Sequence, residues 1–283
     1  MLAPLPDGLA RRVRARLQSR AGPPLLQGYQ DLAKLAGKHD RGAAGGPLAA
    51  AMPPLALAAA VSAAVLLPAG GAAPLGFAGD LVAFVYLLGL ATVALIVAGT
   101  AAGSAYGFAG ANRELLLVLF AEPCAALALF ALALRAGSFR LAEIAAFQAG
   151  AGPGMSGVMA GASLLLALLA WTGRPPFDLS EAEQELTGGL LAEYGGRRLA
   201  MLRWALQVRS LAVAWLIGEL LVPTPAPFAL ALPLALAKAL ALLALASGAE
   251  TLLARLRLRE ARLYLANVAA LAALAIAFAL IGS

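Results

Sequence analysis

Seven long apolar stretches constrain the fold of this chain more than any other feature. Each is close to the roughly 20 residues that an α-helix needs to cross the hydrocarbon core of a bilayer. They lie at about 48–68, 81–101, 115–134, 155–172, 205–222, 227–248 and 262–281. Hydrophobic residues make up 62% of the chain and charged residues only 13%, which excludes an ordinary soluble domain. The sequence therefore predicts an all-α, polytopic membrane bundle of about seven transmembrane helices.

Lysine and arginine are concentrated in alternate connections between these stretches. Eight, one, four and three of them lie in the segments 1–47, 102–114, 173–204 and 249–261. The other connections, 69–80, 135–154 and 223–226, hold only Arg135 and Arg140. Because basic loops stay on the cytoplasmic side, we expect a cytoplasmic N-terminus in a cell inner (plasma) membrane. The predicted organisation is a cytoplasmic amphipathic segment, 1–47, followed by a transmembrane bundle, 48–283, with a cytoplasmic acidic loop, 174–196.

The acidic loop, "RPPFDLSEAEQELTGGLLAEYGG", is the most unusual part of the sequence. It holds five of the fifteen carboxylate side chains: Asp178, Glu181, Glu183, Glu185 and Glu193. Ser180 followed by Glu183 has the form of a capping box, which predicts a short helix ending at Gly188 and Gly189. One interpretation is a solvated acidic helix. Alternation with apolar residues and flanking arginines favour a packed cluster, in which repulsion raises the pKa of a carboxyl as a proton relay requires.

Four charged residues lie inside the predicted spans: Glu122, Arg209, Glu219 and Lys238. A charge at mid-bilayer costs several kcal/mol, so such residues usually face the bundle interior and pair with one another. They are candidates for an intramembrane proton path, or for structural ion pairs. Arg209 lies close to the predicted start of its span, where its side chain could extend to the interface.

The N-terminal segment carries an amphipathic pattern. Apolar residues recur at helical spacing from Leu25 to Leu35, with polar residues opposite, which predicts a helix lying in the membrane interface. It either attaches to membrane lipid or forms a docking surface for a cytoplasmic partner. Its few aromatic residues argue against nucleic acid.

Metal and cofactor motifs do not occur in the sequence. Cys124 is the only cysteine and His39 the only histidine, so the chain is expected to hold no iron–sulfur cluster. Glycines spaced by four, such as Gly99, Gly103 and Gly107, indicate close helix packing.

The acidic loop resembles the signature of the respiratory complex I subunit 1 family. Its "EAEQEL" form, followed by "LRWALQVRSLAVAWLIGELLVP", is most similar to the hydrogenase branch of that family. This branch comprises the membrane anchors of formate hydrogenlyase and of energy-converting membrane-bound nickel–iron hydrogenases. Two further stretches agree: "RARLQSRAGPPLLQGYQDLAKLAGK" and "YGFAGANREL" followed by "FAE". The family usually has an apolar helix before the amphipathic segment, and we expect that first helix to be missing here.

The resemblance implies a non-catalytic membrane subunit that anchors a catalytic arm and helps couple electron transfer to proton or sodium translocation. The five loop acids and Glu122 would carry the coupling, with Glu219, Lys238 and Arg209 as possible continuations. The nickel–iron centre and the iron–sulfur clusters would belong to partners: hydrogenase large and small subunits, an iron–sulfur subunit and antiporter-like membrane subunits. The alternative is the quinone-site subunit of an NADH–quinone oxidoreductase. A stand-alone ion transporter is disfavoured because no internal repeat is visible.

Overall fold

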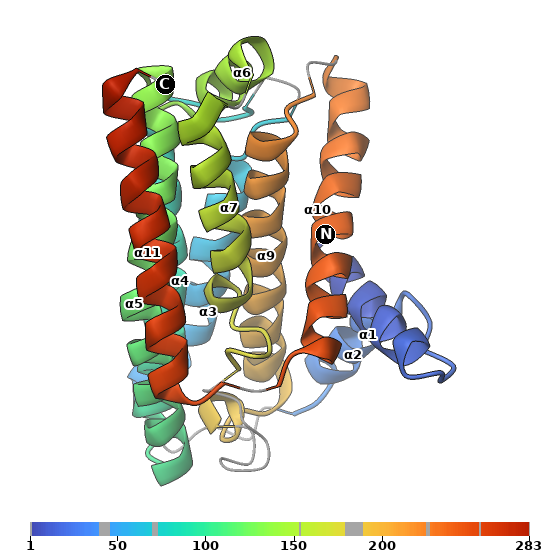
Figure 1. The fold of residues 1–283 in the computed structure, drawn as a ribbon. Helices are drawn as coiled ribbons and strands as arrows, with labels where there is room; N and C mark the ends of the chain where they lie inside the picture. Colours follow the sequence, from blue (N-terminus) through green and yellow to red (C-terminus); the bar gives the residue numbers. More distant parts are fainter. Residues whose placement is uncertain are drawn as a thin grey trace.

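A computed structural model describes residues 2–39, 46–69, 73–152, 154–178, 189–224, 227–254 and 256–282 (Figure 1). Seven of its helices have the length and hydropathy of membrane spans: α3 (Gly46–Val65), α4 (Asp80–Ala101), α5 (Ala105–Ala136), α7 (Gly154–Trp171), α9 (Gly196–Leu221), α10 (Phe228–Leu252) and α11 (Leu258–Ile281). The others are α1 (Leu5–Leu17), α2 (Gln27–Ala36), α6 (Leu141–Ala151) and the 3₁₀ helix η1 (Gly189–Leu191). The prediction of an all-α membrane bundle with seven spans is confirmed.

Two spans begin well before their apolar stretches, by more than two helical turns. The stretches start at about 115 and 205, whereas α5 begins at Ala105 and α9 at Gly196. Hydropathy marks only the part of a helix whose side chains are mostly apolar. The first turns of both helices carry arginines and Glu114, and they stay helical because they pack against other parts of the protein at this end of the bundle.

The bundle has two ends that differ in chemistry. We call the end that carries residues 102–104, 172–178 and 189–195 the loop end, and the end that carries α6 the far end (Figure 1). Tyr194 ties the loop end together, because its hydroxyl donates to the carbonyl of Ala98 at 2.9 Å. At the far end, the backbone N–H of Leu141 donates to the carboxylate of Asp80 at 2.7 Å.

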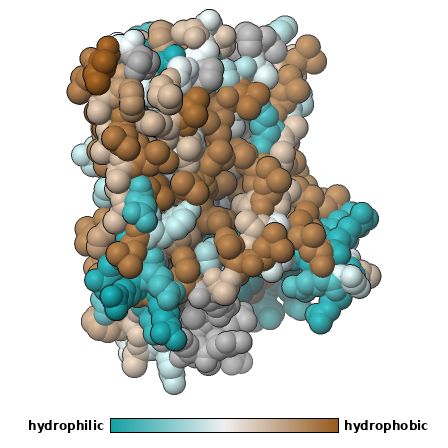
Figure 2. Space-filling view, in the orientation of Figure 1, coloured by the Kyte–Doolittle hydropathy of each residue, from teal (hydrophilic) through white to brown (hydrophobic). Residues whose placement is uncertain are grey.

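Helix α9 is the most buried of the spans: 67% of its most apolar stretch of 18 residues is buried inside the protein. It packs against α3 and α10, while α5 packs against α7 and α11 on the other side (Figure 1). Most large exposed side chains of the outer spans are apolar, such as Leu230 at 60% and Leu245 at 72% exposure. Figure 2 shows this hydrophobic surface over the side of the bundle, with hydrophilic residues gathered towards the loop end and over α1 and α2.

Small residues allow α4 and α5 to approach each other closely. A Cβ atom added at Gly107 would lie 2.7 Å from the carbonyl oxygen of Gly99. Gly103 serves a different purpose, because it adopts a φ of +77° in the turn between the two helices. The spacing of Gly99 and Gly107 therefore reflects backbone contact, as the sequence indicated.

The N-terminal segment forms two helices where one was expected. The predicted amphipathic helix is α2, and the basic stretch before it forms α1. Pro23 and Pro24 lie between them, in the connection from residue 18 to residue 26. Helix α1 packs against α10, and α2 packs against α9.

Candidate functional site

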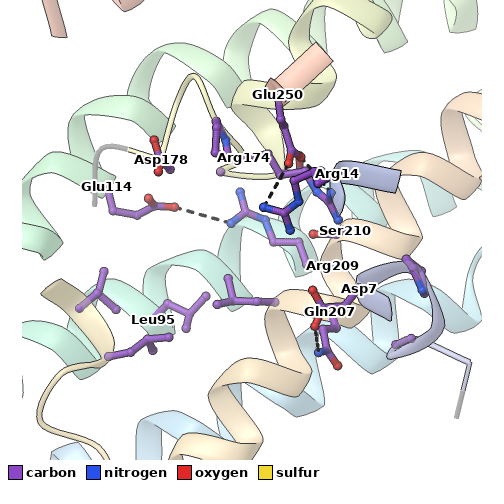
Figure 3. Close-up of a pocket in the computed structure, with 18 residues that line it drawn as sticks. Asp7, Arg14, Leu95, Glu114, Arg174, Asp178, Gln207, Arg209, Ser210 and Glu250 are labelled. Atoms are coloured by element: carbon purple, nitrogen blue, oxygen red, sulfur yellow. Dashed lines mark hydrogen bonds and ion pairs between the residues drawn. The ribbon is translucent and has the colours of Figure 1, made fainter. Parts of the chain in front are cut away.

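A polar cavity of about 430 Å³ opens at the loop end of the bundle (Figure 3). Helices α1, α9 and α10 and residues 172–178 surround it, with contributions from α4, α5 and η1. Its charged lining residues come from five separate parts of the chain: Asp7, Arg14, Glu114, Arg174, Asp178, Arg209 and Glu250. Seven charges in one cavity of a chain with so few charged residues mark this as the candidate site, which we call the loop-end cavity.

Glu250 is the centre of one ion cluster in the cavity wall. Its side chain is only 3% exposed, and Arg174 donates to it at 3.0 Å. Arg14 of α1 approaches the other carboxylate oxygen at 3.7 Å. The cluster therefore links α1, the end of α10 and the first residues of the acidic loop. Charge-assisted contacts of this kind are stronger than neutral hydrogen bonds, particularly where they are shielded from water.

Arg209 is the centre of a second cluster, deeper in the bundle. Its side chain is 3% exposed, and its Nη2 donates to the carbonyl of Trp171 at 2.7 Å. Its Nη1 lies 3.7 Å from the carboxylate of Glu114. The expectation that the Arg209 side chain extends to the membrane interface is therefore wrong, because the side chain is buried among internal partners. Helix α9 begins at Gly196, so Arg209 lies in its middle, and a charge there is stable only with internal partners.

A third group of charges holds α1 to α2 beside the cavity. Arg11 donates to Asp7 at 2.8 Å and to Asp31 at 2.7 Å. The hydrogen bond from Arg11 lowers the pKa of Asp31. Gln207 of α9 donates to Asp7 at 3.4 Å, so the N-terminal helices are joined to the wall of the cavity.

Three buried polar atoms of the lining have no hydrogen-bond partner among the described residues. They are Nε of Arg14, Oε1 of Gln207 and Nε of Arg209. Buried polar atoms in native proteins are almost always hydrogen-bonded, to protein or to water. A cavity of this size and polarity has room for several water molecules. The lining therefore offers polar groups that can bind water.

The structure describes two of the five loop acids, and they lie in different places. Asp178 lines the cavity, whereas the exposed Glu193 does not. Glu181, Glu183 and Glu185, together with the predicted capping box, lie outside the described residues. Burial raises the pKa of the neighbouring Tyr194. Of the two loop acids that the structure describes, Asp178 is thus the one at the cavity.

Glu122 lies elsewhere, at a groove of about 380 Å³ formed by α4 and α5. Gly89 gives it room, because a Cβ atom there would lie 3.3 Å from Oε2 of Glu122. Oε1 of Glu122 is buried without a hydrogen-bond partner among the described residues. Apart from Glu122, the groove residues are almost all apolar or aromatic.

Glu219 and Lys238 form an ion pair between α9 and α10, away from the loop-end cavity. Lys238 also donates to the carbonyl of Val222 at 2.8 Å and to Thr224 at 3.2 Å, at the far end of α9. Glu219 is 1% exposed. The four intramembrane charges of the sequence analysis therefore occupy three places, and the structure does not gather them into one cluster.

Sequence reasoning missed several lining residues, above all Glu114 and Glu250. Glu114 lies one residue before an apolar stretch, so it was assigned to a loop. Glu250 lies near the end of α10, and its partner Arg174 is 76 residues away. Extending the predicted helix through "ANREL" would have placed Glu114 on a membrane span. No local sequence pattern predicts that Glu250 is buried beside Arg174. Among the described residues no group of three or more His, Cys, Asp or Glu side chains could hold a metal ion.

Comparison with known proteins identifies the family. Residues 1–281 match the NADH dehydrogenase family. Hydrogenase-4 component C of Escherichia coli (strain K12) is 35% identical over 79% of this chain and 72% of that protein. Formate hydrogenlyase subunit 4 of the same strain is 33% identical over 78% and 74%.

The fold is also similar to that of a chain in a solved structure, over nearly its whole length. That structure is of the membrane-bound sulfane sulfur reductase, an archaeal respiratory membrane complex. A chain of that complex is 26% identical, with a TM-score of 0.89 over 98% of this chain and 94% of its own length. The chain is thus a multi-pass membrane protein that belongs to the NADH dehydrogenase family, similar to complex I subunit 1 and its hydrogenase relatives.

Proposed function

We propose that this chain is the integral membrane subunit of a hydrogenase or formate hydrogenlyase complex. It anchors the catalytic arm at the loop end and helps couple electron transfer to the movement of protons, or of sodium ions. The similarity to hydrogenase-4 component C and to formate hydrogenlyase subunit 4 supports this assignment.

The loop-end cavity is the observation that carries the proposal. It joins the start of the acidic loop, at Asp178, to buried charges in the bundle, at Arg209 and Glu114 (Figure 3). A unit charge about 10 Å away acts on a carboxyl by about 1.7 kcal/mol at an effective dielectric constant of 20, or about one pKa unit. An electron arriving in a partner docked at this end therefore favours proton uptake by acids in the cavity wall.

The alternative, a quinone-site subunit of an NADH–quinone oxidoreductase, requires a different lining. Ligand pockets for apolar molecules are lined mainly by apolar and aromatic side chains with few polar groups. The loop-end cavity instead carries three arginines and four carboxylates. A quinone with an apolar tail would displace the water that these charges need, so the lining favours the hydrogenase assignment.

Orientation, partners and cofactors follow from the same proposal. The connections rich in lysine and arginine lie at the loop end, so this end with the N-terminus faces the cytoplasm of the inner membrane. The hydrogenase large and small subunits, an iron–sulfur subunit and antiporter-like membrane subunits are the proposed partners. The nickel–iron centre and the iron–sulfur clusters reside in those partners.

Purification of the tagged chain from its native membrane tests the assignment. We expect it to co-purify with a nickel-containing subunit, and we expect vesicles of those membranes to move protons or sodium ions during hydrogen formation. Co-purification with flavin- and NADH-binding subunits would establish the quinone alternative.

The acidic loop has its own test within this proposal. Replacement Glu183→Gln or Glu185→Gln is expected to impair coupled activity while the yield of the complex stays unchanged, because only the titratable group is lost. Glu260→Gln, at the start of α11, is the matched control. Normal coupling in all loop variants would remove the loop from the mechanism.

A further inference from the structure

We propose that the outer side of α1, together with the end of α10, binds an anionic phospholipid. Arg12, Arg16 and Arg20 hold the phosphate of the headgroup, and exposed leucines of α1 and α10 contact the acyl chains. This interaction surface lies outside the loop-end cavity. It goes beyond the proposed function and does not depend on it.

The arginines of α1 and of the turn that follows it divide into two sets. Arg11 and Arg14 face carboxylates of the protein inside the ion clusters described above. The side chains of Arg12, Arg16 and Arg20, by contrast, form no ion pair or hydrogen bond with any described residue. One side of α1 is therefore neutralised by the protein, and the described part of the chain supplies no counter-charge to the other.

The unpaired arginines gather at the outer end of α1. Arg12 and Arg16 are four residues apart and so lie next to each other on one face of the helix. The backbone N–H of Arg20 donates to the carbonyl of Ala15 at 2.7 Å, which turns the chain back against the end of the helix. Like charges at this spacing destabilise a helix, so a bound anion stabilises this arrangement.

Contacts with α10 place this end of α1 at the membrane interface. A Cβ atom added at Gly248 of α10 would lie 3.9 Å from Cδ1 of Leu17. Helix α10 has 25 residues, or about 37 Å, which exceeds the roughly 30 Å of the hydrocarbon core. Its last turns, which contain Gly248, therefore lie at the depth of the lipid headgroups. Figure 1 shows α1 extending sideways from this end of α10.

An apolar surface adjoins the arginines. Leu245 and Leu252 lie three residues before and four residues after Gly248, so they share its face of α10, and they are 72% and 85% exposed. Leu17 is 58% exposed beside them. Figure 2 shows that hydrophilic residues of α1 adjoin the hydrophobic side of the bundle.

Unpaired arginines above exposed leucines match the two halves of an anionic phospholipid. A free phosphate ion would contact only the arginines. A soluble acidic protein would not reach leucines at the depth of the headgroups.

The experiment measures which lipid lies beside α1. A fluorophore is attached to Gln18→Cys, an exposed position next to Leu17, while the buried Cys124 stays unlabelled. The labelled protein is purified with any bound partner subunits and placed in phosphatidylcholine nanodiscs. These contain either brominated phosphatidylglycerol or brominated phosphatidylcholine, because bromine quenches fluorescence only at short range. We expect the anionic lipid to quench at a mole fraction about fivefold lower or less, the effect of at least one arginine.

Two outcomes with this protein overturn the inference. Equal quenching by the two lipids would mean that the surface does not select anionic headgroups. Absence of quenching by either lipid would mean that a protein partner covers this end of α1.

Variants with matched charge changes locate the site. Arg16→Gln with Arg20→Gln should lose the preference for phosphatidylglycerol, while quenching by brominated phosphatidylcholine stays unchanged and shows that α1 still lies at the membrane. Arg16→Lys with Arg20→Lys should keep the preference, because the charge remains. Arg259→Gln with Arg262→Gln is the control, since both arginines are exposed at the start of α11, on the other side of the bundle (Figure 1). An equal loss of preference in this control would attribute lipid selection to net charge and overturn the inference.

Discussion

At the scale of single residues, the contacts of Glu250 show how buried charge is made stable in this protein. One carboxylate faces two arginines from different parts of the chain, Arg14 and Arg174. Replacement Glu250→Gln would leave these arginines near each other without a counter-charge. We expect the free energy of unfolding in detergent to fall by about 2–3 kcal/mol, less than for a fully buried pair because Arg14 is 38% exposed.

Glu143→Gln is the control for this stability measurement. Glu143 and its partner Arg140 are both more than half exposed, and exposed ion pairs contribute little. Glu143→Gln should therefore lower the free energy of unfolding far less than Glu250→Gln does. An equal loss of stability in both variants would mean that burial of Glu250 has no special energetic role.

The pair of Arg11 and Asp31 predicts a pH dependence at the same scale. Because the hydrogen bond from Arg11 lowers the pKa of Asp31, this carboxylate stabilises the folded state at pH values above its unfolded value. The contribution disappears as the pH falls through the lowered pKa. Amide hydrogen exchange in α2 should be faster in Asp31→Asn than in wild type at pH 7. The two proteins should exchange alike below the lowered pKa, and a difference that persists there would contradict the assignment.

At the scale of helices, close contact between α4 and α5 depends on glycine. Replacement Gly107→Ala puts a methyl group 2.7 Å from a backbone oxygen, which cannot move without shifting α4. We expect a loss of about 1–3 kcal/mol in the free energy of unfolding, as for other overpacked sites. Gly150→Ala in α6 is the control, because no atom lies within 4 Å of the added Cβ. Equal stability of the two variants would show that α4 and α5 can move apart without loss of stability, and would contradict this prediction.

The helices also show what a sequence can predict. Apolar stretches gave all seven spans, because the bilayer imposes a length and a composition on each of them. The same rule could not predict the first turns of α5 and α9, because these turns are polar and are stabilised by packing against other parts of the protein. Helix α1 was missed because its basic residues read as a flank of α2. Glu250 was missed because its partner lies 76 residues away, and no local pattern encodes such a contact.

At the scale of the whole molecule, charge and topology together predict which side of the membrane each end faces. The loop end carries the basic N-terminal helices, and the far end carries residues 73–79 and α6 (Figure 1). Gln18 and Ala78 are exposed positions at these two ends. By the distribution of lysine and arginine, Gln18 should face the cytoplasm and Ala78 the opposite side.

Labelling of single introduced cysteines with a membrane-impermeant thiol reagent tests this orientation. The native cysteine does not have to be removed first. Cys124 is buried, and its thiol donates to the carbonyls of Phe120 and Leu265, so wild type should remain unlabelled. Gln18→Cys should react in inverted vesicles and not in intact cells, and Ala78→Cys should do the reverse. The opposite pattern would place the loop-end cavity outside the cytoplasm. Electrons arriving from a cytoplasmic arm could then not act on its acids, because the thickness of the bundle would separate the two.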